Sequence, residues 1–168
     1  MIENILTIRL YGDPCLRKKS TPVKEIGPSE RLLIQAMIET MYKHKGIGLA
    51  APQVGINEQI FVADIGQGPF AVVNPRIIKK KGFSVVEEGC LSIPGVLVEI
   101  KRPETIVVRY IDENNRIVER EASELLARVI QHETDHLYGK LTIDYARWKD
   151  KGKINKQLQK IVDENKNK

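Results

Sequence analysis

The chain has 168 residues, of which 42% are hydrophobic and 29% charged, and it carries a formal net charge of +5. This composition is typical of a globular protein, and two cysteines are too few for a disulfide scaffold. The opening stretch, MIENILTIRLYGDP, predicts neither a secretion nor a transit signal, and no apolar run approaches the ~18 residues of a membrane-spanning helix, so we expect one cytoplasmic domain over residues 1–168.

The first predicted element is a helix over about residues 29–43. Pro28 and Ser29 open it, and apolar residues repeat at helical spacing through Leu33, Met37 and Met41. The next stretch, GIGLAAPQVGI (residues 46–56), is small, apolar and interrupted by glycine and proline. It predicts a loop whose backbone approaches another group closely.

Short β-branched segments follow, each bounded by Gly, Pro, Asn or Asp, and they predict strands over residues 59–64, 70–74, 76–81 and 96–101. The segment EEGCLSIPG lies between two of them and is predicted to be a loop. TIVVRYI and RIVERE flank DENN (residues 112–115), which indicates a hairpin.

A second helix begins after this hairpin, with Ser123 as its expected cap and Gly139 suited to its end. A third, C-terminal helix is marked by Ile154, Leu158, Ile161 and Val162. Strands between helices, with an antiparallel hairpin, predict an α+β fold of short, mostly antiparallel strands around the second helix.

The excess positive charge is confined to the C-terminus. Residues 147–168 hold eight basic and three acidic side chains, whereas the other 146 residues sum to zero. A solvated helix face is the commoner meaning of such a run, and contact with a polyanion such as RNA is the alternative.

The stretch QHETDHL (residues 131–137) carries the clearest chemical signal. His132 and His136 lie one helical turn apart, so both rings can reach one metal ion. Glu133 follows the first histidine, where such sites use a carboxylate to take a proton from metal-bound water. Two of the three histidines of the chain fall in this pattern, which favours a metal site over coincidence.

The third ligand decides the class of metal site. Some metalloproteases place a third histidine where this chain has Thr142, and others use a later glutamate, for which only Glu164 in the polar tail is available. Both protease routes are therefore weak. The remaining candidates are His44, Cys15 and Cys90, of which Cys90, beside a glycine and between two strands, is favoured. One thiolate with two imidazoles suits zinc, ferrous iron or nickel.

Three segments in this order, GIGLAAPQVG, EGCLS and QHETDHL, resemble the motifs of the peptide deformylase family, bacterial type. YGDPCLRKKS and HLYGKLTIDY extend the resemblance over residues 8–145. It implies a metal-dependent hydrolase that removes the formyl group from the N-terminal formyl-methionine of new polypeptides and releases formate.

The resemblance also implies roles for individual residues. Cys90, His132 and His136 would bind the metal, with water in the fourth position and Fe²⁺ as the physiological ion, zinc or nickel being expected after purification. Glu133 would serve as general base and then as general acid. The side chain of Gln53 and the backbone N–H of Leu91 would stabilise the oxyanion.

Further residues match the substrate side of the family's site. Ile47 and Gly48 would offer backbone groups to the substrate, and the methionine pocket would be lined by Ile47, Val86, Leu125 and Val129, although these residues fit a plain core nearly as well. Glu88 and Arg102 are predicted to form an ion pair that supports the EGCLS loop. The basic tail is compatible with docking on the ribosome, as the family's C-terminal helix can do.

Two other functions remain as alternatives. A zinc peptidase would cleave internal peptide bonds. A non-catalytic module that binds RNA or the ribosome would close the metal's fourth position with a protein ligand such as His44, and would not need Glu133. One departure from the family leaves the preference beyond methionine open, because the residues after SIP are Gly95, Val96 and Leu97, where some relatives carry polar or aromatic side chains.

Overall fold

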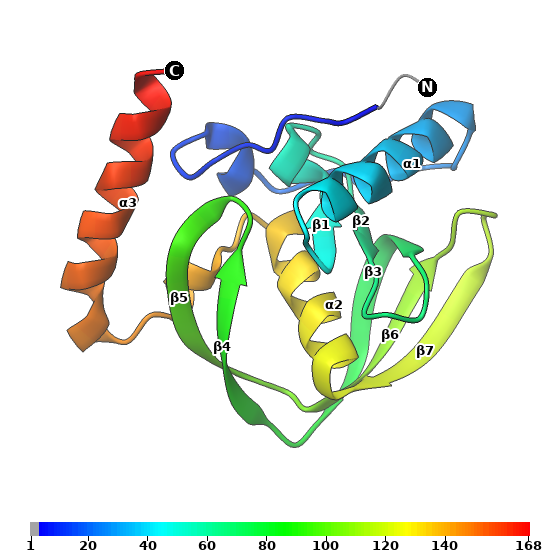
Figure 1. Cartoon of the computed structure of the whole chain (residues 1–168). Coiled ribbons are helices and arrows are strands. Elements are labelled where there is room, and N and C mark those ends of the chain that lie inside the picture. The colour runs from blue at the N-terminus through cyan, green and yellow to red at the C-terminus, as the bar shows by residue number, and fades with distance from the viewer. Residues whose placement is uncertain (1–3) are drawn as a thin grey trace.

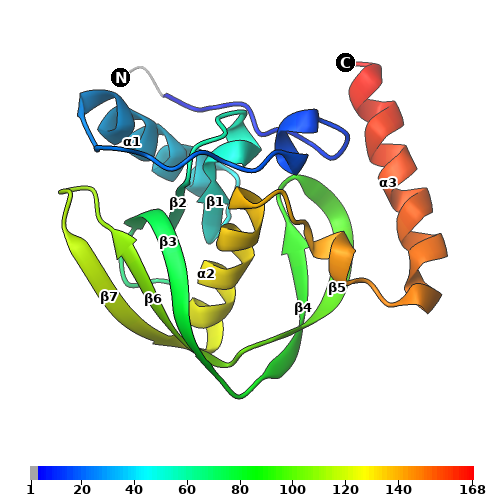
Figure 2. The ribbon, with the colours of Figure 1, turned by 180° about the vertical axis from the view of Figure 1, so that it is seen from behind.

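The computed structural model of the protein describes residues 4–168; the first three residues of the opening stretch lie outside it. Its strands form two separate sheets, and helix α2 (Glu124–Leu137) lies between them (Figures 1 and 2). The larger sheet has the order β1-β2-β3-β6-β7 and the smaller one is the β4-β5 hairpin; all of these pairs are antiparallel. The bounds are β1 Gly48–Ala50, β2 Ile60–Ala63, β3 Phe70–Lys81, β4 Ser84–Cys90, β5 Ile93–Arg102, β6 Thr105–Ile111 and β7 Ile117–Ser123.

The α+β class, the central helix and the two flanking helices are as predicted. Helix α1 (Pro28–Lys43) begins with a proline at its first turn, and the Glu30 carboxylate accepts from the Gly27 N–H at 2.8 Å. Its apolar stripe, including Met37 and Met41, is buried against β1 and β2. The sequence pattern therefore gave both the position and the buried face of this helix.

Two predicted boundaries in the larger sheet are wrong. Residues 46–56 contain strand β1 and a short 3-10 helix, Ala51–Val54, rather than a loop alone. The two segments predicted on either side of Pro75 form one strand, β3. Asn74 takes a φ of 51°, and the register between β3 and β6 shifts between Val73 and Arg76. This irregularity accommodates Pro75, which has no backbone N–H to donate, and β3 continues beyond it.

The prediction that Cys90 lies on a loop is also wrong, because Cys90 is the last residue of β4. Glycine and two glutamates make this segment a poor strand by intrinsic preference. Pairing with β5 overrides that preference: Glu88 lies opposite Val98 and forms an ion pair with Arg102 at 2.9 Å. The strand ends in a tight turn before β5, so the thiol is held at a rigid strand end.

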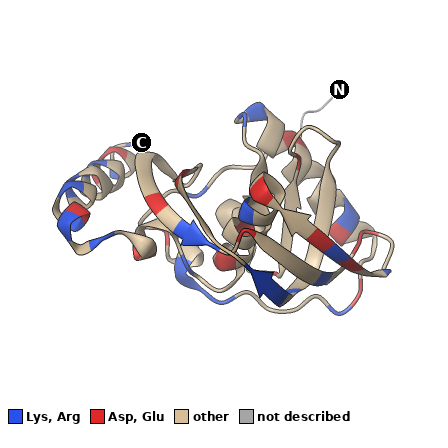
Figure 3. Cartoon of the chain, turned by 90° about the horizontal axis from the view of Figure 1, so that it is seen from below, with Lys and Arg blue, Asp and Glu red and all other residues tan. Residues whose placement is uncertain are grey.

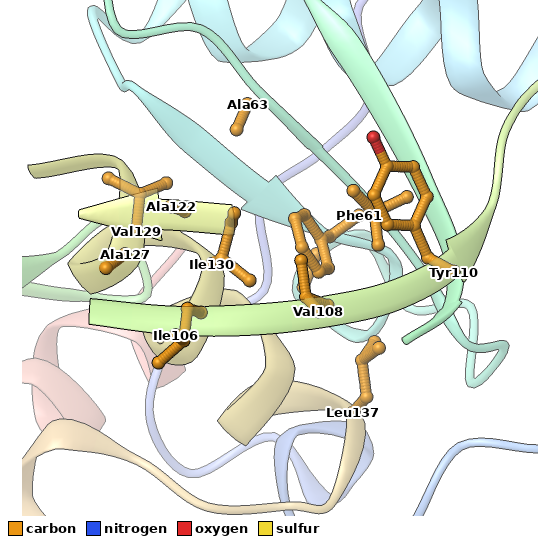
Figure 4. Packing of buried hydrophobic residues seen from close by; sticks show 12 residues of the cluster. Phe61, Ala63, Ile106, Val108, Tyr110, Ala122, Ala127, Val129, Ile130 and Leu137 are labelled. Carbon is orange, nitrogen blue, oxygen red and sulfur yellow. The ribbon is translucent and has the colours of Figure 1, made fainter. Parts of the chain in front are cut away.

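Helix α2 packs its apolar face on the larger sheet, where Ala127, Ile130 and Leu137 contact a cluster that includes Phe61 and Val108 (Figure 4). Each large side chain buried in this way contributes about 1.5–3 kcal/mol. This packing fixes the rotation of α2, so its opposite face, which carries the two histidines, points towards the β4-β5 hairpin.

The two ends of α2 differ in how well they were predicted. Ser123 is at the cap position, but its hydroxyl pairs with Thr105 at 3.0 Å and makes no cap bond. Gly139 ends the helix as expected, with a φ of 73°. A Cβ there would lie 2.4 Å from the Arg17 carbonyl oxygen, so only glycine fits.

An N-terminal arm, defined as residues 9–20, contacts three elements that are distant in sequence. Its backbone N–H groups donate to the carbonyls of Gln53 (2.7 Å), Ser92 (2.8 Å) and Leu137 (2.8 Å). The arm thereby ties the 3-10 helix Ala51–Val54, the β4-β5 turn and the end of α2 to one another.

Helix α3 (Lys151–Lys166) packs against β5 through Ile154, Leu158 and Ile161, and its polar faces carry five lysines and two acidic residues (Figure 3). A 3-10 helix, Trp148–Asp150, precedes it. Among the described residues, none of the helices has the length and hydropathy required to cross a membrane.

Candidate metal centre

Three potential metal ligands meet where α2 faces the end of β4. One donor atom from each of Cys90, His132 and His136 lies within 4.8 Å of the others. The Cys90 Sγ is 3.4 Å from His136 Nε2, which is 3.3 Å from His132 Nε2. Across the described residues this is the one group of three or more such side chains, and neither Cys15 nor His44 belongs to it.

The tautomer of His132 follows from its neighbour. Its Nδ1 lies 3.3 Å from Glu88 Oε1. Burial alone would raise the pKa of Glu88, but hydrogen bonds from His132 and Arg102 outweigh this effect and hold the pKa below its usual value. An ionised carboxylate only accepts, so Nδ1 carries the proton and Nε2 keeps a free lone pair on the ligand side. In the metal-free protein burial lowers the pKa of His132, but hydrogen bonds to Cys90 and Glu88 hold it well above its usual value, so a metal ion would have to displace the second proton, on Nε2.

Glu88 is the centre of a buried polar network. Arg102 donates from Nε to both of its oxygens, at 3.1 and 2.9 Å, and is itself 4% exposed. Arg102 also donates to Asp135 at 2.9 Å and to the Tyr145 hydroxyl at 3.3 Å, and that hydroxyl donates to Asp135 at 2.7 Å. Helix α2, strands β4 and β5 and the 3-10 helix Thr142–Tyr145 are thus joined behind the ligands.

Sequence reasoning missed Asp135, Tyr145 and Arg128 in this network. Arg128 donates to Glu88 at 3.4 Å and to the Ile100 carbonyl at 3.0 Å. Its position four residues before His132 on the same helix face was a usable signal. Tyr145 had no such signal, because its contacts come from elements 10 and 43 residues away along the chain.

Glu133 is buried beside the three donors and is only 4% exposed. Burial raises its pKa to about 7, although the positive His132 opposes that rise. One of its oxygens, Oε2, has no hydrogen-bond partner among residues 4–168. A buried carboxylate with a pKa near neutrality and a free oxygen can both take up and release a proton at physiological pH.

Gln53 lies beside the three ligand atoms. Its Oε1 accepts from the Ala50 N–H at 2.9 Å, so its amide nitrogen must face the site, where it lies 3.2 Å from Ser92 Oγ and 3.5 Å from the Cys90 Sγ. The short 3-10 helix Ala51–Val54 positions this side chain, which is 1% exposed. This orientation directs the side-chain N–H groups of Gln53 towards the metal-ligand atoms.

A cavity of about 530 Å³ opens above these groups. It lies between β1 and β4, which are edge strands of their sheets, and its walls are residues 45–48 and 86–91 together with Gln53, Leu125, Arg128, Val129, His132 and Glu133. Every predicted catalytic and substrate-binding residue lines it, while His136 and Arg102 lie behind its wall.

The residues predicted for the methionine pocket are not a plain core. Ile47, Val86 and Leu125 are 45%, 47% and 49% exposed, and only Val129 is buried, at 5%. Exposed apolar side chains around one cavity are typical of a ligand site. The Ile47 carbonyl already accepts from the Asp64 N–H at 3.0 Å, so one lone pair remains for a ligand.

The donor set fits a divalent metal. A thiolate and two imidazoles are a ligand set of catalytic metal sites, which keep one coordination position open. A carboxylate lies near these three side chains but does not belong to the ligand group. Two other side chains considered as metal ligands lie outside this group. His44 is at the C-terminal end of α1, and Glu164 pairs with Lys160 on α3 at 3.8 Å.

Comparisons with known proteins agree with this geometry. The profile of the family described as Polypeptide deformylase matches residues 5–152. A peptide deformylase from Thermotoga neapolitana is 45% identical over 156 residues, covering 92% of this chain and 95% of the relative. The crystal structure of peptide deformylase from Thermotoga maritima superposes with a TM-score of 0.83 at 48% identity, covering 85% of this chain and 98% of that one. That of a peptide deformylase from Legionella pneumophila gives 0.90 at 35% identity and covers 98% and 99%. The chain therefore belongs to the polypeptide deformylase family and is a metal-dependent hydrolase.

Proposed function

We propose that Cys90, His132, His136 and Glu133 form the centre that hydrolyses the N-formyl group of N-terminal formyl-methionine in newly synthesised polypeptides. The observation that carries this assignment is the meeting of three ligand donors within 4.8 Å, beside a buried carboxylate with a free oxygen, at the base of an open cavity. Cleavage of the formyl carbon–nitrogen bond by water gives formate and a free amine.

The three ligands would hold a divalent ion, and we propose Fe²⁺. Such an ion supplies Lewis acidity and lowers the pKa of bound water. The thiolate makes an iron site sensitive to oxygen, which accords with a cytoplasmic enzyme kept in reducing conditions. Glu88 and Arg102 support the site, because the proton fixed on His132 Nδ1 leaves its Nε2 free for the ion.

Glu133 acts as the proton carrier. Its carboxylate takes a proton from the attacking water and delivers it to the leaving amine nitrogen, so it returns to its starting state after each turnover. A pKa of about 7 suits both steps, and such a role contributes about 10²–10⁴ in rate.

Gln53 and the backbone N–H of Leu91 stabilise the oxyanion. The amide nitrogen of Gln53 is held towards the site by its bond to Ala50, so the donor does not have to reorganise when charge develops. Leu91 lies in the turn directly after Cys90 and lines the same cavity. One such donor is worth about 3 kcal/mol in other enzymes.

The substrate backbone adds to the open edges of β1 and β4, using Ile47 and Gly48 on one side. The methionine side chain enters the apolar part of the cavity formed by Ile47, Val86, Leu125 and Val129. In this arrangement the formyl group at the N-terminal end of the substrate strand lies next to the metal ligands. An internal peptide bond of the substrate would not fit beside these ligands.

Helix α3 is a second contact surface in this proposal. Its basic faces are solvent-exposed, while its apolar face is occupied by β5, so the charges are free to meet a polyanion such as ribosomal RNA (Figure 3). The tail would then bring the catalytic domain to the nascent chain. Salt-dependent sedimentation with ribosomes, compared between the full chain and a variant with Lys153, Lys156 and Lys160 changed to glutamine, tests this part.

The test of the catalytic proposal is a formate-release assay on formyl-Met-Ala, with protein prepared without oxygen and the metal content measured on the same sample. We expect a Glu133→Ala variant to keep its metal and lose activity by about 10²–10⁴. Cleavage of unformylated peptides at internal bonds would instead identify a peptidase. Full activity of Glu133→Ala would refute Glu133 as the proton carrier, and a metal site closed by four protein ligands would support a non-catalytic role.

A further inference from the structure

A second cluster of basic side chains lies on the body of the protein, around the connection between β3 and β4. We call it the basic corner, and it consists of Lys79, Lys80, Lys81, Phe83 and Lys101. All five side chains are exposed, and the corner lies apart from α3 (Figures 1 and 3). The 146 residues before the basic tail sum to zero charge, so the corner concentrates positive charge locally on a body that is neutral as a whole.

The lysines of the basic corner are not neutralised by carboxylates. Among residues 4–168, none of the four forms an ion pair, whereas Arg109 on the same sheet pairs with Glu119 at 2.9 Å. One acidic side chain, Glu104, adjoins the corner beside Gly82. The corner therefore keeps an excess of positive charge that a polyanion could neutralise.

Phe83 distinguishes this cluster from an ordinary solvated run of charge. Its side chain is 65% exposed, and the Lys101 ammonium lies 3.8 Å from the centre of its ring. This cation–π contact holds the ring in place while most of it stays in contact with water. An aromatic ring among unpaired cations is the combination with which proteins bind single-stranded nucleic acid, because the cations contact phosphates and a base stacks on the ring.

The backbone of β3 gives the lysines their spacing. Strand β2 pairs with residues 70–73 only, so residues 76–81 have β6 on one side and no strand on the other. Side chains two residues apart on a strand share a face, so Lys79 and Lys81 lie about 7 Å apart on one side. This separation suits neighbouring phosphates of one nucleic-acid strand.

The basic corner leaves the catalytic cavity open. None of its five residues lines that cavity, and the seven residues of β4 place the corner about 20 Å from Cys90. A ligand at the corner and a substrate in the cavity can therefore be bound at the same time.

We propose that the basic corner binds a single strand of RNA, with the lysines on its phosphates and Phe83 stacked on one base. The excess of positive charge selects a polyanion, and the exposed ring selects an unpaired base over a duplex or a lipid headgroup. This contact depends neither on the reaction in the cavity nor on α3.

The closing experiment titrates the metal-loaded protein with a labelled, unstructured RNA of CAA repeats at several salt concentrations. The parent protein carries Lys153→Gln, Lys156→Gln and Lys160→Gln, so that binding by α3 does not mask the corner. Contacts from four lysines predict that the logarithm of the binding constant falls with the logarithm of the salt concentration with a slope of about −3.

Two variants of this parent separate phosphate contact from stacking. Lys79→Gln with Lys81→Gln should halve the slope, to about −1.4. Phe83→Ala should weaken binding by about 5- to 100-fold and leave the slope unchanged. As a matched control, Lys18→Gln with Lys24→Gln removes the same charge from exposed positions elsewhere and should change neither the slope nor the affinity. Every variant should keep the melting temperature and the formate release of the parent.

Four outcomes would overturn the proposal. Equal effects of the two double variants would reduce the binding to net charge. Unchanged affinity in Phe83→Ala would exclude stacking, and tighter binding of anionic lipid vesicles, lost in the same variants, would exclude RNA as the partner. Aggregation of Lys79→Gln with Lys81→Gln, without any change in RNA binding, would show that these lysines protect the free edge of β3 instead.

Discussion

The close approach of Gly48 to Glu133 yields a sharp test of the proposed proton carrier. A Cβ added at Gly48 would lie 2.5 Å from Glu133 Oε1 and 2.9 Å from its Cδ, whereas ordinary contacts begin at 3.4 Å. The φ of Gly48 is not positive, so alanine fits the backbone of β1 and only the carboxylate must yield. Glu133 would have to retreat by about 1 Å in a tightly packed site, and a displacement of that size can cost about 10²-fold in rate.

Stopped-flow or discontinuous measurement of formate release gives kcat and KM for Gly48→Ala, which we expect to lose about 10²-fold in kcat while it keeps its metal. A matched control is Gly152→Ala on α3, where nothing lies within 4 Å of the added Cβ and alanine stabilises the helix. The same substitution in a Glu133→Ala background should then have almost no further effect, because the group it displaces is gone. Equal losses in both backgrounds would refute the reasoning and place the clash with the substrate instead.

Three further predictions concern the ligands and their support. Arg102→Ala removes the cation that lies nearest to the buried Glu88 carboxylate, so we expect a loss of about 3–5 kcal/mol in the free energy of unfolding and a 10- to 100-fold weaker metal affinity, both visible in denaturant and chelator titrations. Arg109→Ala, which breaks an exposed pair, should cost under ~1 kcal/mol; equal costs for the two variants would contradict the assignment. In the metal-free protein, Glu133 has a folded-state pKa of about 7 against 4.5 when unfolded, so its ionisation destabilises the fold as pH rises between these values. Glu133→Gln should therefore equal the wild-type protein in stability near pH 4.5 and exceed it by about 3 kcal/mol above pH 7, and a constant difference across this range would exclude the shift. Chelation should lower the melting temperature of the wild-type protein but have little effect on Cys90→Ser, which is expected to bind metal poorly; a similar fall in both would argue against Cys90 as a ligand.

Local patterns were sufficient to predict the metal-binding helix. The apolar face of α2 and the spacing of His132 and His136 both depend on the same helical period, so each supported the other. The candidate proton carrier Glu133 and the helix end at Gly139 were predicted from the sequence of the same helix. The order of three motifs then indicated Cys90 and Gln53, which lie far from the helix in sequence and meet it in the fold.

Features that depend on contacts between distant segments were missed or misjudged. Strand β4 pairs with β5, and two buried arginines compensate the charge of Glu88; neither effect is visible in the segment itself. The loop assigned around Cys90 was wrong for this reason. Tyr145 and Asp135 were overlooked because their bond to Arg102 joins three elements whose proximity only the folded chain reveals.

The N-terminal arm has a consequence for synthesis of the protein itself. Its three backbone bonds reach Gln53, Ser92 and Leu137, so the segment that is made first waits for a partner more than a hundred residues later. The ligand cluster likewise needs Cys90 and His136 together. During translation the growing chain therefore remains without a closed site until α2 has left the ribosome. The enzyme is then expected to become competent in one late step, rather than in stages as each element emerges.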